Sequence, residues 1–96
     1  MITLDEFHAL SRDAAEGDLD AMYRLAKGFI FGEIFGEPDV ENGVRLLENA
    51  ANRGHAGALH LAGELHEKTR KYKKALECFT RASNLGHKPS WSKMYY

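Results

Sequence analysis

The residues of this chain with the most chemical potential are five histidines and one cysteine, because imidazole and thiolate groups bind metals and move protons. His60 and Glu64 are four residues apart, which places an imidazole and a carboxylate on one helix face, as two ligands at one edge of a metal ion. No third ligand follows at helical spacing. Because Cys78 is the single cysteine of the sequence, an internal disulfide and a cysteine-based zinc site are excluded. We therefore expect no metal and no cofactor.

Catalytic motifs are also missing from the sequence. The segment Gly32–Gly36 has two glycines but lacks the following lysine and the preceding strand of a phosphate-binding loop. There is no nucleophile elbow and no dinucleotide fingerprint. Cys78 precedes Phe79 in a helical pattern and has no fixed histidine partner, which favours a small, half-buried packing residue. We expect that the protein is not an enzyme.

Charge and length restrict the partners further. Ninety-six residues predict a single domain, and a net charge of −1 with interleaved signs gives no electrostatic footprint for nucleic acid. The densest basic run, residues 68–74, has five cations in seven residues. We interpret this run as a solvated turn at the start of a helix rather than as a phosphate site.

Membrane and export signals are not found. No apolar run approaches the roughly 18 residues of a membrane span. Residues 1–6 lack the basic region and apolar core of a signal peptide. The expectation is a cytoplasmic protein that does not contact a membrane.

Apolar residues recur at helical spacing through the chain, and alternation typical of a strand is never sustained. The pattern predicts an all-α fold. Capping residues support the helix starts: a capping box at Thr3–Glu6, then Asp18 and Asp39. Glycines 17, 54 and 86 are the expected helix ends. The six expected helices lie near residues 4–16, 18–31, 39–53, 56–68, 71–85 and 88–95.

Each expected helix carries an apolar stripe that we predict to be buried. The stripes are Leu4, Phe7, Leu10 and Ala14; Ala21, Met22, Leu25, Ala26 and Phe29; Val40, Val44, Leu47, Ala50 and Ala51; Ala58, Leu59, Ala62, Leu65 and His66; and Tyr72, Ala75, Leu76, Phe79 and Ala82. On this interpretation Leu47 and Leu76 are equally sensitive to a charge, because each would bury an unpaired carboxylate as aspartate.

One turn motif occurs in three imperfect copies, at residues 13–21, 50–58 and 82–90. Gly54 lies 37 residues after Gly17, and Gly86 lies 32 residues after Gly54. Periods of this size are typical of helix-turn-helix solenoids. The first offset carries Ala21 onto Ala58, and the second carries Leu47 onto Phe79, so residue size agrees at matched positions.

The repeat gives most histidines a structural interpretation. His55 and His87 stand where Asp18 stands, just after the turn glycine, which is a helix-start position. His60 replaces Tyr23, and His66 replaces Phe29, at packing or groove positions. The metal hypothesis is correspondingly weakened.

Three segments resemble a known family. Residues 50–58 resemble the A-A-x-x-G-x-x-x-A join of Sel1-like repeats, which are relatives of tetratricopeptide repeats. Residues 21–26 resemble the A-x-Y-x-L-G opening of their helix A, and residues 72–79 resemble the Y-x-x-A-x-x-x-[YF] pattern of their helix B. The resemblance covers about residues 4–95. It implies a short α-solenoid of two and a half repeats, with a leading B-type helix and a trailing A-type helix.

The resemblance also implies a function and a surface. Such a module binds a partner protein or peptide along the inner face of its helices A. Mixed charge with aromatic residues suits a protein ligand better than nucleic acid. The positions carried over to this sequence are Asp20, Tyr23, Arg24, Lys27, His60, Leu61, Glu64, Lys68, Lys93 and Tyr96.

Alternatives stay open at this point. The chain is also interpretable as a dedicated inhibitor or immunity-type protein that blocks one enzyme, as short free-standing bacterial chains often do, or as a metal protein or enzyme built on its histidines. Two apolar groups either fold back onto the core or form interfaces. One is the loop with Ile30, Phe31, Ile34 and Phe35. The other is the C-terminal set Trp91, Met94, Tyr95 and Tyr96, of which the first three form a candidate homodimer surface.

Overall fold

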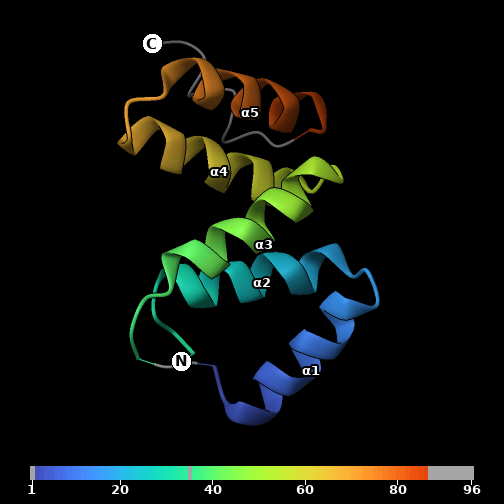
Figure 1. Cartoon of the computed structure of the whole chain (residues 1–96). Helices are drawn as coiled ribbons and strands as arrows, with labels where there is room; N and C mark the ends of the chain where they lie inside the picture. The colour runs from blue at the N-terminus through green and yellow to red at the C-terminus, as the bar shows by residue number, and fades with distance from the viewer. Residues whose placement is uncertain (1, 35, 87–96) are drawn as a thin grey trace. The chain divides into compact units, whose positions relative to one another are not determined.

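The computed structural model describes residues 2–34 and 36–86, and this part of the chain contains α-helices and no strand (Figure 1). The helices are α1 (Leu4–Ala15), α2 (Leu19–Ile30), α3 (Val40–Asn52), α4 (Ala56–Lys68) and α5 (Tyr72–Asn84). The predicted all-α class is confirmed. The five described helices begin and end within one residue of the expected positions, and the sixth expected helix, near 88–95, lies outside the described residues.

The chain divides into two compact units between Ala50 and Ala51. The first unit contains α1, α2 and most of α3, and the second contains α4 and α5. None of the described helices is long and apolar enough to cross a membrane.

Side chains cap the helix starts where the sequence predicts them. The Thr3 hydroxyl accepts a hydrogen bond from the Glu6 amide at 3.1 Å, and the Asp18 carboxylate accepts from the Ala21 amide at 3.1 Å. Asp39 accepts from the Asn42 amide at 3.3 Å. One detail differs from the expected capping box: the Glu6 carboxylate accepts from the Thr3 hydroxyl, at 3.1 Å. Such caps each contribute about 1 kcal/mol to helix stability.

The core of the first unit lies where α1 and α3 pack on α2. Met22, Leu25 and Ala26 are buried, and Ala26 is fully so. The Phe7 and Phe29 rings meet edge to face, with centroids 6.3 Å apart. Gly43 of α3 lies so close to α2 that an added Cβ would stand 2.5 Å from Ile30. Small residues therefore set the spacing of these helices.

The apolar loop after α2 folds back on its own helix. Gly32 takes a positive φ of 71°, and the Glu33 amide then donates to the Gly28 carbonyl at 2.8 Å. Ile34 packs over Gly28, where a Cβ would come within 2.8 Å of it, and Ile30 is buried. Of the loop's expected apolar set, Phe31 is 52% exposed and Phe35 lies outside the described residues.

The core of the second unit lies between α4 and α5, which run side by side as a helical hairpin (Figure 1). Leu59 and Phe79 are nearly fully buried, at 1% and 2% exposure. The Phe79 ring covers Gly63 so closely that an added Cβ would stand 2.6 Å from its edge. The hairpin thus depends on a large residue on one helix facing the smallest residue on the other.

Four residues predicted to be buried are exposed: Leu4, Val40, Tyr72 and Leu76, at 65%, 50%, 62% and 53%. The first three are the opening residues of their helices, where no neighbouring turn covers them. Leu76 has another reason. Ala75, Phe79 and Ala82 form the α5 stripe against α4, and Leu76 lies about 100° further round the helix.

Leu47 and Leu76 should now respond differently to aspartate. Leu47 is 1% exposed, so Leu47→Asp buries an unpaired charge and should abolish cooperative unfolding. Leu76→Asp should change the free energy of unfolding by only about 0.5 kcal/mol, as surface substitutions do. Urea denaturation followed by circular dichroism measures both. Equal effects of the two substitutions would contradict the packing described here.

A second prediction concerns the contact between Gly63 and Phe79. Gly63→Ala should destabilise the protein by about 1–3 kcal/mol despite alanine's better helix propensity, because the methyl group collides with the buried ring. Trimming the ring in Gly63→Ala/Phe79→Leu should cost less than the two single changes added together. Denaturant melts of the four proteins give this coupling, and strict additivity would refute the collision.

Candidate functional site: the exposed faces of α2 and α4

The exposed side of α2 carries the four residues that the sequence assigned to a binding surface, here called the α2 face. Asp20 and Arg24 are exposed, while Tyr23 and Lys27 are half-buried. Their spacing of three and four residues puts them on one side of the helix. The Lys27 ammonium lies 5.1 Å from the centroid of the Tyr23 ring, a cation–π contact. This contact orients a cation and an aromatic ring together.

A pocket of about 220 Å³ adjoins the α2 face. Arg24 and Lys27 line it together with Glu33 and Ile2. The backbone brings the last two residues there, because the Ile2 amide donates to the Glu33 carbonyl at 2.9 Å. Two cations and one carboxylate make this pocket suitable for a polar or charged side chain of a ligand. No pattern in the sequence indicates Ile2 or Glu33 as pocket residues, because the chain reversal after α2 places them there.

The corresponding α4 face consists of His60, Leu61, Glu64 and Lys68. The first three are half-buried, and Lys68 is exposed. His60 is held on two sides: its Nε2 lies 3.3 Å from the Glu64 carboxylate, and its ring lies 5.3 Å from the Phe79 ring. Its side chain is only 16% exposed. His60 is therefore mainly a packing residue whose edge reaches the surface.

The paired His60 and Glu64 have no third ligand nearby among the described residues. Within residues 2–34 and 36–86, no group of three or more His, Cys, Asp or Glu side chains could hold a metal ion. Cys78 is half-buried on α5, as expected for a packing residue.

Eight of the ten predicted binding residues belong to these two faces, four in each unit. The remaining two, Lys93 and Tyr96, lie outside the described residues, as do Trp91, Met94 and Tyr95 of the proposed homodimer surface.

The histidine at the central turn is a helix cap, which confirms the interpretation drawn from the repeat. His55 Nδ1 accepts a hydrogen bond from the Ala58 amide at 3.0 Å. Asp18 makes the same bond to Ala21, three residues on, at the start of α2. The geometry assigns His55 to helix initiation rather than to chemistry.

Comparison with known families places this architecture. The model of the Sel1 repeat matches residues 19–55 and 56–87, which is most of the chain. Each match begins at a helix-A position, with α2 and with α4. The chain belongs to the Sel1 repeat family, and Sel1 repeats act in general as protein–protein interaction modules. Comparisons with curated proteins and with solved structures gave no match.

The cap at His55 gives a prediction about stability. His55→Ala should lower the free energy of unfolding by about 1 kcal/mol, because the first turn of α4 loses its acceptor. His55→Asn should retain most of the stability, since asparagine is a good helix cap. Thermal or urea unfolding distinguishes the two. If asparagine were as damaging as alanine, the cap would not be the role of His55.

Proposed function

We propose that the chain binds a partner protein or peptide through the α2 and α4 faces, and that it does so without catalysis. One observation carries the proposal: the two family repeats begin at α2 and α4, and the outer sides of these helices carry charged residues together with Tyr23 on α2 and Leu61 on α4. Such a mixture is suited to a protein ligand, which combines apolar contact with a polar rim.

The α2 face supplies the sharper recognition. Arg24 and Lys27 meet Glu33 at the pocket, so a ligand carboxylate can pair with the cations while a ligand amide donates to Glu33. Tyr23 adds an aromatic surface beside Lys27. The α4 face adds Leu61 for apolar contact and Lys68 for charge. Recognition of this kind needs position and complementarity, not a reactive group.

Histidine chemistry is the weaker candidate function. His60 is occupied by its contacts with Glu64 and Phe79, and His55 by its cap on α4. If either imidazole turned to bind a ligand, it would lose these contacts, and the fold would lose the stability that they contribute. This cost favours binding over catalysis for the family's helix-A surface.

Affinity capture from the native host tests the proposal with matched variants. Arg24→Glu/Lys68→Glu reverses one exposed cation on each face, and Arg12→Glu/Arg53→Glu makes the same charge change at exposed positions outside both faces. Wild type and the second variant should retain the same partner by mass spectrometry. The face variant should lose it, with at least a tenfold weaker affinity in direct titration, about 1.4 kcal/mol.

The outcomes decide between accounts. A partner retained equally by the face variant would contradict the use of α2 and α4. If the sole partner were an enzyme that loses activity in the complex, the protein would be an inhibitor working through the same faces. Capture of no partner by wild type would contradict the binding function.

A further inference from the structure

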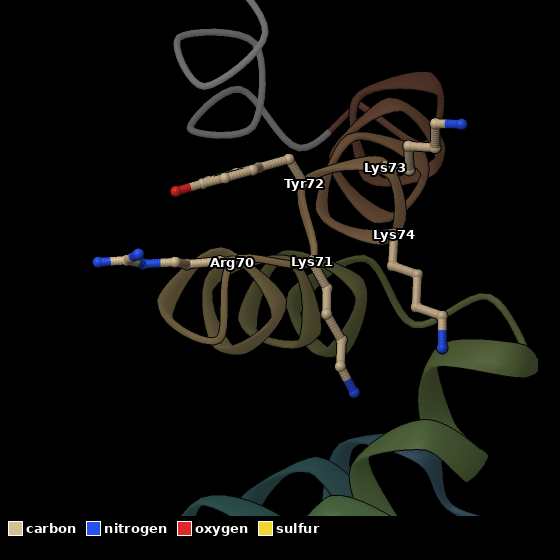
Figure 2. Close-up of a pocket in the computed structure, with 5 residues that line it drawn as sticks. All are labelled: Arg70, Lys71, Tyr72, Lys73 and Lys74. Carbon is tan, nitrogen blue, oxygen red and sulfur yellow. The ribbon is translucent and has the colours of Figure 1, made fainter.

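A second surface lies outside the α2 and α4 faces, at the connection between α4 and α5. Residues 70–74, here called the basic turn, line a pocket of about 400 Å³ (Figure 2). Four of its five residues are cationic: Arg70, Lys71, Lys73 and Lys74. All five are exposed. The sequence predicted only a solvated turn here, and the structure adds a shallow, open hollow.

The backbone of the basic turn fixes the direction of its side chains. The Lys71 amide donates to the His66 carbonyl at 2.8 Å, and the Arg70 amide donates to the Glu67 carbonyl at 3.1 Å, which together close α4 as a Schellman motif. Arg70 takes the left-handed position, with a φ of 62°. Figure 2 shows the Arg70 and Tyr72 side chains extending in the same direction, with Lys71 and Lys74 extending in another.

Electrostatics at the start of α5 favour an anion. Lys71 is the N-cap residue of α5 and makes no side-chain capping hydrogen bond, and the first turn of α5 contains no acid. Lys73 and Lys74 therefore add positive charge to the positive end of the helix dipole. In the part of the chain that the structure describes, no cation of the basic turn forms a salt bridge. The turn thus concentrates unpaired positive charge on a chain of net charge −1.

An apolar strip adjoins this charge. Tyr72 and Leu76 are one helical turn apart on α5 and are 62% and 53% exposed. Aromatic and apolar side chains beside cations are a feature of protein interfaces, where an apolar centre is bordered by charge. Nucleic acid would use the cations but would leave the aliphatic Leu76 without a role.

We propose that the basic turn is a docking site for an acidic segment of a partner protein that carries an apolar side chain. The segment's carboxylates pair with Arg70, Lys71 and Lys74, and its apolar side chain covers Tyr72 and Leu76. The basic turn shares no residue with the α2 and α4 faces, so this proposal holds or fails independently of them.

The test uses fluorescence anisotropy with three labelled probes. The first is a peptide of glutamates with two leucines, the second its glutamine counterpart, and the third a single-stranded oligonucleotide of equal charge. The acidic peptide should bind saturably, and its affinity should fall by about tenfold or more between low salt and 0.3 M salt. The glutamine peptide should not bind measurably.

Matched variants locate the contact. Lys71→Gln/Lys74→Gln and Leu76→Asp should each weaken peptide binding at least about tenfold, a change equivalent to roughly 1.4 kcal/mol. Arg53→Gln/Arg81→Gln makes the same net charge change as the lysine pair at exposed positions outside the turn and should leave affinity unchanged. The variant Arg24→Glu/Lys68→Glu should weaken peptide binding far less than the lysine pair does. Circular dichroism confirms that each variant is folded.

Three results would overturn the proposal. The first is no saturable binding of the acidic peptide to wild type. The second is an equal loss in Arg53→Gln/Arg81→Gln, which would show a general charge effect. The third is an oligonucleotide that binds more tightly than the peptide and depends on the same lysines, which would make the basic turn a nucleic-acid site.

Discussion

The close approach of helices at small residues is the constraint on which each unit depends. Gly43 brings α3 against Ile30 of α2, and Gly63 brings α4 under the ring of Phe79, each at a distance that leaves no room for a Cβ. Such contacts bury apolar area efficiently but leave little tolerance for a change in volume. They also determine which helix faces remain outside. Because the small and apolar residues of α2 and α4 pack inside the two units, the polar residues of these helices remain on the outside.

Packing and helix capping also account for two of the histidines. A chain with five histidines invites a catalytic or metal-binding interpretation. Of the three histidines in the central repeat, His55, His60 and His66, the first two have structural roles. His55 caps α4, and His60 packs on Phe79 while pairing with Glu64. The chain belongs to the Sel1 repeat family, whose repeats act in general as protein–protein interaction modules. We therefore assign the proposed recognition to the charged residues and Tyr23 of the α2 face rather than to histidine side chains.

Sequence reasoning succeeded where one local rule decides the outcome. Thr3, Asp18 and Asp39 cap helices, and repeat alignment correctly placed His55 beside them. It failed where position around or along a helix matters: Leu76 is one residue from the buried stripe, and Tyr72 opens a helix with nothing over it. The α2 pocket was also out of reach, because Ile2 and Glu33 meet through backbone hydrogen bonding far apart in sequence. The sequence pattern predicted which residues lie on the outer sides of α2 and α4, but not the residues that complete the pocket beside α2.

Hydroxyl-radical footprinting of the chain, alone and in complex with its captured partner, tests the central claim most directly. It reports the solvent exposure of individual side chains and does not depend on a substitution. The account predicts that Tyr23 on α2 and Leu61 on α4 lose reactivity in the complex, while the exposed Phe31 in the loop after α2 keeps its own. Protection of Phe31 with Tyr23 and Leu61 unchanged would contradict it.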